Sequence, residues 1–446
     1  MMPRFPAPLA LLPFILVSAH GHPLTQASPG THGQELTLPA ALRAAWSQQP
    51  GLQAGQALVD RARLDSEAAS ALLLPTLQAQ AGWMRTDEPM MAFGMKLNQA
   101  RIQAADFNPA SLNHPKAVTG LGANVTLQQP LYAGGRITAA RRATSAMADA
   151  ESSLQAHRKQ QVALAVVQAY FGAQAAAAGL TYAEDTLKTA QGTEAFVAAR
   201  VQQGLMFRAD LARVKAWRAQ AEAALAEARR QEQSARSGLA LLTGWAPTGH
   251  LSTPLDAPAP AAAAPAQRAD LRAAAYQTDA ARAYAQAVGG SLKPEVGLNL
   301  SVGTARETFS APGGTWTTAS VGAKWTFAFG DTKKTQAARA GARAAELSQR
   351  WQQAQAARET TEAEGAVGTA EAKVRAAAEG LAAAEEAREL RQARHREGLT
   401  PLTELLDAES ALAGARALRL GALLELRTAH AQRALALGSP VEGVEP

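Results

Sequence analysis

The sequence contains no cysteine, and this absence excludes several kinds of chemistry. Disulfide bonds, thiolate metal sites and cysteine nucleophiles are ruled out, and so is a lipid-modified cysteine at a processed N-terminus. Aromatic residues are also scarce, at 5% of 446 residues, although 47% of the residues are hydrophobic. A large globular core normally uses aromatic side chains for bulk, whereas the alanine that dominates here is the best helix former. The composition therefore predicts long, closely packed helices rather than a conventional core.

Neither sign of charge is in large excess, because 44 Lys and Arg residues face 38 Asp and Glu residues. The charges are interspersed, without a basic block or an alternation of basic and aromatic residues, so we expect no nucleic-acid binding. Known catalytic patterns such as HExxH, GxSxG, the Walker loop and GxGxxG are also missing. The eight histidines are scattered and lack metal-ligand spacing. We therefore expect no enzyme, no metal site and no cofactor.

The first residues of the chain have the features of a secretory signal peptide. Arg4 is the only charge in residues 1–21, residues 9–17 form an apolar segment, and residues 19–21 include small residues at the cleavage spacing. The apolar segment is too short to span a bilayer, and the prolines within it and before it argue against a buried helix. We expect the protein to be exported and residues 1–21 to be removed.

The rest of the chain repeats one plan twice: a helix, two strands, a very long helix, a turn and a last helix. The first copy covers 36–245 and the second 268–437, with a proline- and alanine-rich linker at 246–267 and a tail at 438–446. Alternation of apolar with small or polar residues predicts strands at about 75–86, 117–130, 293–304 and 316–329. Proline-free runs predict long helices at 135–202, 207–243, 331–397 and 401–437, and shorter helices are expected at 36–73 and 268–289. Residues 85–116 are expected to form a loop.

Equivalent landmarks in the two copies are separated by nearly the same distance along the chain. Gly134 and Gly330, which end the strands, are 196 positions apart, and Gly204 and Gly398, in the helical turns, are 194 apart. The near-constant offset indicates duplication. A helix over 135–202 would be about 100 Å long, which is typical of a coiled-coil-like assembly rather than of a globular core.

The four strands each have one apolar face and one small, polar face, which favours a membrane barrel with lipid outside and water inside. Near the strand ends lie aromatic residues that we expect at the membrane interfaces: Trp83, Trp316, Trp325 and Phe327. Four strands cannot close around a water-filled lumen, since small barrels need about eight, so several chains must contribute. A soluble hairpin covered by helices is the alternative, but it would need larger apolar residues. The uncharged stretch 162–183 is long enough for a membrane helix, yet its alanines and glutamines favour tight helix packing.

This layout resembles the TolC-like outer-membrane efflux proteins from about residue 36 to 437. The resemblance rests on the segment 129–136 at the first strand exit, on 327–330 at the second, and on the turn 398–408, which reads GLTPLTELLDA. It implies a mainly α fold with a membrane β-barrel contribution, in which a homotrimer forms one barrel and a helical tunnel across the periplasm. It further implies a passive conduit in the outer membrane, from the periplasm to the exterior, that is joined to a periplasmic adaptor and an inner-membrane pump of the resistance-nodulation-division or ABC type.

The resemblance also implies roles for residues in the two helical turns. Glu404 and Asp407 match carboxylates that ring the periplasmic entrance, and their spacing of three places both on one helix face. Rings of carboxylates favour cations. The same two residues also fit ordinary first-turn acids stabilised by the helix dipole, so both interpretations stand.

Asp210 matches a family position that helps to hold the entrance closed. Its basic partner in the family falls at Thr400 here, and Arg213, at the first-repeat equivalent of Asp407, is the candidate replacement. The docking surface for the adaptor is expected at the turn residues Gly204, Leu205, Gly398, Leu399 and Thr400. A helix-ending glycine with a hydrophobic contact also explains both turns.

A periplasmic coiled-coil scaffold or adaptor without a barrel is the alternative function. The paired alternating strands discriminate against it, because a scaffold has no need for strands with glycine, asparagine and threonine facing water. A tripartite efflux or type I secretion channel in the outer membrane is therefore the favoured function.

Overall fold

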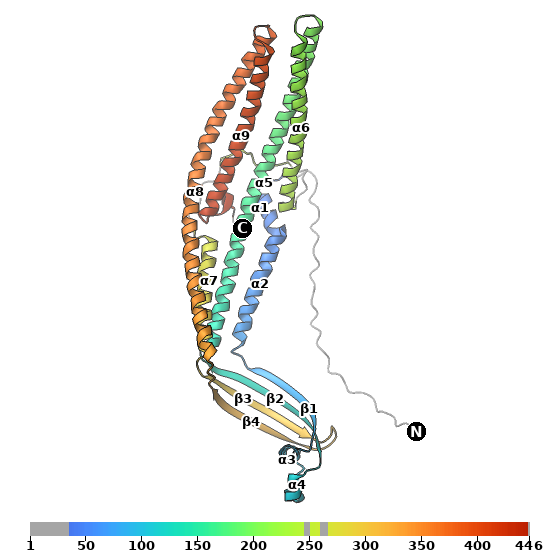
Figure 1. Ribbon diagram of the computed structural model, residues 1–446, viewed down its shortest axis with the longest axis vertical. Coiled ribbons are helices and arrows are strands. Elements are labelled where there is room, and N and C mark those ends of the chain that lie inside the picture. The colour runs from blue at the N-terminus through green and yellow to red at the C-terminus, as the bar shows by residue number, and fades with distance from the viewer. Residues whose placement is uncertain (1–34, 245–249, 259–265, 445–446) are drawn as a thin grey trace, which may run out of the picture.

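The computed structural model describes residues 35–244, 250–258 and 266–444, so the predicted signal peptide lies outside the described residues. The molecule is elongated, with helices standing on a curved sheet at one end (Figure 1). The first copy contains α1 (Leu38–Gln48), α2 (Pro50–Ala71), β1 (Thr76–Thr86), α3 (Pro89–Asn98), the 3-10 turn η1 (Ala104–Phe107), α4 (Pro109–Asn113), β2 (Val118–Ala133), α5 (Arg136–Gln202) and α6 (Arg208–Thr243). The second contains α7 (Ala269–Gly290), β3 (Glu295–Arg306), β4 (Gly313–Lys324), α8 (Phe329–Arg396), α9 (Leu402–Ala436) and the 3-10 turn η2 (Val441–Gly443).

Two helices run almost the full length of the helical part, α5 with 67 residues and α8 with 68. Each folds back at its far end, so that α5 pairs with α6 and α8 pairs with α9. Near the sheet, the shorter helices α2 and α7 take the places of α6 and α9, with α7 between α5 and α8. Both hairpin tips therefore lie at the end of the molecule opposite the sheet (Figure 1).

The largest buried cluster lies halfway along the helices, where chain segments distant in sequence meet. The Tyr170 hydroxyl donates to the Leu36 carbonyl at 2.6 Å and accepts from the Thr253 amide at 2.9 Å. Leu42, Phe171 and Val441 are fully buried in the same cluster. Three segments thus pack around the middle of α5: the N-terminal segment, the described part of the linker and the C-terminal tail. The tail is therefore part of the core.

Helix α5 is the one helix in the described residues that is long and apolar enough to cross a membrane, judged by length and composition. The stretch 162–183 supplies Val166, Val167, Tyr170 and Phe171 to the buried cluster. These side chains pack against α1, α6 and α9.

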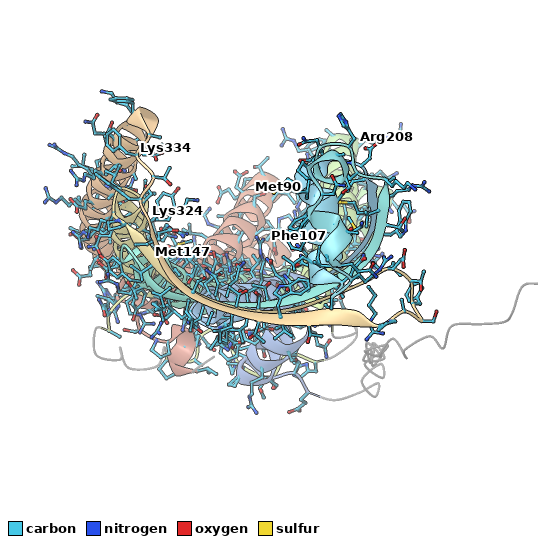
Figure 2. All side chains as sticks on the ribbon, turned by 90° about the horizontal axis from the view of Figure 1, so that it is seen from below. Met90, Phe107, Met147, Arg208, Lys324 and Lys334 are labelled. Atoms are coloured by element: carbon cyan, nitrogen blue, oxygen red, sulfur yellow. The ribbon has the colours of Figure 1, made fainter. Side chains whose placement is uncertain are left out.

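The four strands form one antiparallel sheet in the order β1-β2-β3-β4. The register places Leu77, Val125, Leu300 and Val321 on one face and Gln80, Asn124, Asn299 and Ser320 on the other. Seen from the sheet end, the sheet is an arc, with α3 and Lys324 on its concave side (Figure 2). Lys324 pairs in register with Glu295, on the same face as Asn299. The polar face is therefore concave, and the apolar side chains are exposed on the convex face.

The last strand ends earlier than the sequence pattern predicted. Lys324 pairs with Glu295, the first residue of β3, so residues beyond Lys324 have no neighbouring strand. Instead, the Trp325 indole nitrogen donates to the Leu292 carbonyl at 3.1 Å, and α8 begins at Phe329. The alternation of apolar residues continues to residue 329, but the strand ends where β3 no longer offers residues to pair with.

Two further differences concern the first copy. The helix expected at 36–73 is divided, because Pro50 starts α2 and the Gln49 side chain caps it by accepting from the Leu52 amide at 2.9 Å. The loop expected at 85–116 contains α3, η1 and α4. Both of its helices begin with a proline at the first helical position, where the missing N–H costs nothing.

Candidate functional site

The two helical turns have the same backbone geometry. Gly204 and Gly398 adopt left-handed φ values of 74° and 76°. The following leucine amides each donate to a carbonyl five residues back, Leu205 to Arg200 and Leu399 to Arg394, both at 2.9 Å. This is the glycine-ended helix stop, which satisfies carbonyls that the helix leaves unpaired. Both leucines are exposed at the tips, as is Phe207.

A small buried cluster joins the two hairpins just behind their tips. Val197 of α5 and Val214 of α6 are fully buried against Leu402 and Leu405 of α9. Partly buried residues around this cluster include Met206, Leu211, Trp217 and Leu406. The tips are therefore held together by apolar packing, which places the charged residues of the two turns near one another at the same end of the molecule.

The two candidate entrance carboxylates have different surroundings. Glu404 on α9 forms an ion pair with Arg391 on α8, within the same hairpin. Asp407, one turn further on, is exposed and has no ion-pair or hydrogen-bond partner in the described ranges. The sequence spacing places the two carboxylates on one helix face, whereas in the described residues Glu404 has a charged partner and Asp407 has none.

The candidate gating residues are not brought together within one chain. Asp210 is half-buried and accepts a hydrogen bond from the Phe207 amide at 3.3 Å, so it caps the start of α6. Arg213 is exposed, and no described residue pairs with its side chain. Thr400 lies in the second turn, where its carbonyl is 3.1 Å from His395 Nδ1. A contact of Asp210 with either residue would have to come from a second chain.

The structure also identifies residues near the tips that the sequence patterns did not single out. His395 is buried against the ring of Phe196, with 6.2 Å between ring centroids, and so links α8 to α5. Each hairpin has a cross-helix ion pair at 2.8 Å, Glu194 with Arg218 and Arg388 with Glu409. Glu194 and Arg388 are 194 positions apart, so equivalent positions carry opposite charges. Comparing the copies position by position singles out Glu194 and Arg388, but it does not identify their partners, which are not at equivalent positions.

Three of the four aromatic residues expected at membrane interfaces are exposed near the two ends of the sheet. Trp83 lies on the convex face near the far end of β1, and Trp325 and Phe327 lie where the sheet meets the helices. Trp316 differs, because its register partner Gly303 is on the concave face and the indole covers that glycine. The register therefore places Trp316 on the concave face and not against lipid, contrary to what we expected for this residue.

A convex apolar sheet with a polar concave face, continued by a wall of long helices, defines a membrane channel with a helical tunnel. Residues 41–245 and 262–439 match the profile of the outer membrane efflux protein family. The match covers most of the chain, and the chain belongs to this family. It is an outer-membrane efflux channel with a periplasmic tunnel, and proteins of this family work with adaptor and pump partners.

Solved structures with the same fold include several outer-membrane channels. A membrane protein from Pseudomonas aeruginosa is 20% identical, with a TM-score of 0.77 and 91% of each chain covered. The Campylobacter jejuni CmeC outer membrane channel is 14% identical, with a TM-score of 0.79, covering 92% of this chain and 86% of that one. The open state of the Neisseria gonorrhoeae MtrE channel is 22% identical, with a TM-score of 0.75, covering 92% and 90%. No curated protein matches the chain in sequence.

Proposed function

We propose that three copies of the chain assemble into one passive channel whose periplasmic entrance carries a ring of Asp407 carboxylates. The edges of the described sheet support an assembly of copies. Strands β1 and β4 each have one neighbour, and they run in opposite directions in the order β1-β2-β3-β4. The β4 edge of one copy can therefore pair with the β1 edge of the next while the sheet stays antiparallel. If the rotation that relates neighbouring copies closes into a ring, every β1 edge is paired with a β4 edge and no strand edge stays exposed.

The observation that carries the entrance assignment is the difference between Glu404 and Asp407. Because Arg391 neutralises Glu404 within its own hairpin, Asp407 is the one of these two carboxylates that has no counter-charge among the described residues. Repeated around a symmetry axis, this carboxylate makes a ring that favours cations and holds divalent ions. Asp210 and Arg213, which lack each other as partners within the chain, are proposed to meet residues of the neighbouring copy when the entrance is closed.

Single-channel conductance in planar bilayers tests this proposal. Wild-type protein should give small, cation-selective steps that are blocked by divalent cations. Asp407→Asn should weaken the block severalfold and reduce the selectivity, whereas Glu404→Gln, the matched control, should change either one much less. Equal effects of the two substitutions would remove the assignment of Asp407, and an absence of conductance from inserted trimers would reject the open conduit.

The exposed apolar tips, Leu205 and Phe207 in one turn and Leu399 in the other, are proposed to dock the adaptor. Their exposure on a glycine-ended turn gives a partner helix pair an apolar surface with a defined backbone shape. Leu205→Asp with Leu399→Asp should lower the amount of adaptor that cross-links to the channel in cells while conductance stays unchanged. The same amount of cross-linked adaptor would place the docking surface elsewhere.

A further inference from the structure

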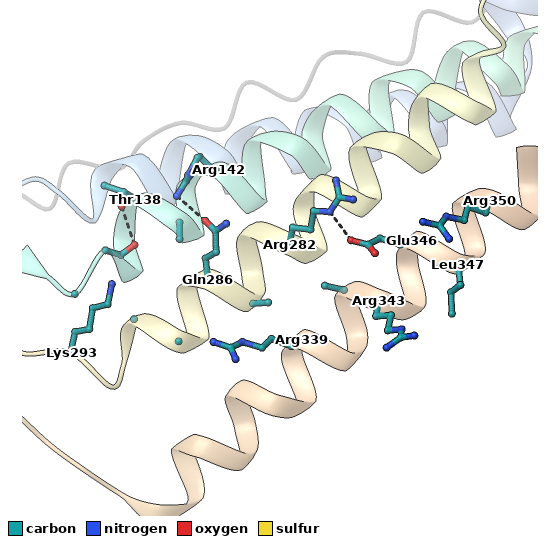
Figure 3. Close-up of a pocket in the computed structure, with 17 residues that line it drawn as sticks. Thr138, Arg142, Arg282, Gln286, Lys293, Arg339, Arg343, Glu346, Leu347 and Arg350 are labelled. Carbon is teal, nitrogen blue, oxygen red and sulfur yellow. Dashed lines mark hydrogen bonds and ion pairs between the residues drawn. The ribbon is translucent and has the colours of Figure 1, made fainter.

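A basic groove lies in the helical wall directly beside the sheet, between α5, α7 and α8. Its volume is about 980 Å³, and Figure 3 shows the side chains that line it. One carboxylate, Glu346, lines it together with six cationic side chains, Arg142, Arg282, Lys293, Arg339, Arg343 and Arg350. So strong an excess of one charge sign in a hollow concentrates the potential there and attracts anions.

Most of these cations lack a counter-charge among the described residues. Arg282 pairs with Glu346 at 2.8 Å, and Arg142 donates to the neutral Gln286 side chain at 3.0 Å. The other four have no side-chain partner in the part of the chain that the structure describes: Lys293, Arg339, Arg343 and Arg350. Arg339 and Arg343 are four positions apart on α8, an arrangement in which like charges repel on a helix surface. An external anion would relieve this repulsion.

The start of α5 adds to the positive character of the groove. Gly135, the residue before the helix, and Thr138 in its first turn both line the groove. A helix N-terminus presents unpaired N–H groups and the positive end of the helix dipole. An added Cβ on Gly135 would find nothing within 4 Å, so the backbone at this end is open to a ligand.

The groove opens on the outer side of the wall. Arg136 pairs at 3.0 Å with Glu295, which lies on the concave face of the sheet. Arg142 follows six positions later, which is about 240° around the helix at 3.6 residues per turn. Arg142 therefore projects to the convex side, away from the lumen.

The groove also begins at the level where the apolar sheet ends. Lys293 follows Leu292, whose carbonyl accepts the Trp325 indole N–H at 3.1 Å. Trp325, Phe327 and Phe329 are all exposed at this junction, and exposed aromatic residues of this kind lie at the headgroup level of a membrane. The end of the groove nearest the sheet therefore lies at the same level as the periplasmic boundary of the hydrocarbon region.

We propose that this groove binds the phosphate groups of anionic phospholipids in the periplasmic leaflet of the outer membrane. Guanidinium groups suit this ligand, because they donate two parallel hydrogen bonds to phosphate oxygens. Lys293 and Arg339 lie nearest the sheet and hold the headgroup, and Arg339 extends from α8 towards α7 (Figure 3). The bound lipid fixes the depth of the barrel, a task that an attached acyl chain cannot perform in a chain without cysteine.

Electron paramagnetic resonance of spin-labelled lipids tests the proposal on the full-length channel. The protein is reconstituted in phosphatidylcholine vesicles that contain a trace of spin-labelled phosphatidylglycerol or phosphatidylcholine. The measured quantity is the motionally restricted fraction of each label. Wild-type protein should hold phosphatidylglycerol severalfold more strongly than phosphatidylcholine, and salt should weaken this preference.

The variant Lys293→Gln, Arg339→Gln, Arg343→Gln should lose the preference. The control Arg375→Gln, Arg394→Gln, Arg396→Gln neutralises three exposed cations of α8 far from the sheet and should keep it. Arg339→Lys with Arg343→Lys should also keep most of it, and retained conductance in the same vesicles shows that each variant is folded. Unchanged preference in the groove variant, or none in the wild type, would overturn the proposal. Binding of inorganic phosphate to the wild type that the groove variant loses, with no preference for phosphatidylglycerol over phosphatidylcholine, would identify a free-phosphate site and reject the lipid.

Discussion

The two helical turns share a backbone and differ in their charges. In the first turn, Asp210 binds the amide of Phe207 and serves its own helix. In the second, Glu404 occupies the equivalent position and pairs instead with Arg391 on the neighbouring helix. One turn later, the first copy carries Arg213 and the second carries Asp407. The backbone follows from glycine and capping residues close in sequence, while the electrostatic role of each side chain depends on the helix opposite.

The apolar residues behind the tips differ in the same way. Leu405 of the second copy is buried between the hairpins, whereas its first-copy equivalent, Leu211, is only partly buried at the margin of the same cluster. The duplicated sequence therefore makes an asymmetric contact, in which leucines of α9 are buried in the cluster and Leu211 of α6 stays at its margin.

The largest expected effect on this asymmetry comes from truncating the two leucines. Leu405→Ala should destabilise the protein by about 2–4 kcal/mol, since it removes a buried side chain and leaves a cavity. Leu211→Ala should cost about half as much, because the site is partly open to solvent. The difference in Tm of the purified channel in detergent measures the two effects. Equal losses would mean that the two copies contribute alike to the cluster.

Substitution of the turn glycines should instead show that the backbones are equivalent. Gly204→Ala and Gly398→Ala each place a Cβ in a left-handed conformation, which costs about 1 kcal/mol. An added Cβ would find nothing within 4 Å at either position, so crowding adds no further penalty. The Tm shifts should agree with each other, and a much larger shift at one turn would reveal a packing role there.

Alanine in place of the two equivalent acids should separate their roles. Asp210→Ala removes a cap from α6 and should cost roughly 0.5–1 kcal/mol. Glu404→Ala breaks an ion pair between partly exposed side chains, which is worth about 0–1 kcal/mol and less at high salt. Thermal melting at low and at high salt distinguishes them. Both variants lose a first-turn carboxylate near the helix dipole, but only the Glu404 variant also loses an ion pair, so its salt dependence should fall more.

The smallest effect on stability is expected at Arg391. Arg391→Gln leaves the hairpin folded but frees the Glu404 carboxylate, so the channel should become more cation-selective. The reversal potential in a salt gradient measures this change. The control is Arg213→Gln in the other turn, which removes a cation that has no ion-pair partner among the described residues and therefore frees no carboxylate. Unchanged selectivity in the Arg391 variant would show that Glu404 does not face the permeation path.

The order of the elements could be predicted from the sequence because it depends on local signals. Alternation with a period of two, the absence of proline and the two left-handed glycines place the strands, the long helices and the turns within a few residues of their observed positions. The same signals missed the short helices α3 and α4. Each is shorter than the isolated helices that are stable in water, so they depend on packing, α3 against the sheet and α4 against α3 and η1.

Features that depend on pairing could not be predicted. The end of β4 at Lys324 is set by the start of β3, and the side on which Trp316 lies is set by the register with Gly303. The same holds for Glu404, whose spacing from Asp407 says nothing about Arg391 on another helix. The burial of Val441 likewise requires the tail to return to a cluster built around Tyr170.

Local sequence was thus sufficient for the duplicated plan, the amphipathic strands and the glycine-ended turns, since each follows from the backbone preferences of neighbouring residues. Only the packed helices decided which charges are neutralised and which remain free. Coulomb interactions act between groups that are close in space, and closeness across helices depends on the side chains that pack between them. Asp407 at the tips and the unpaired cations beside the sheet became distinguishable from other exposed charges once these neighbours were in place.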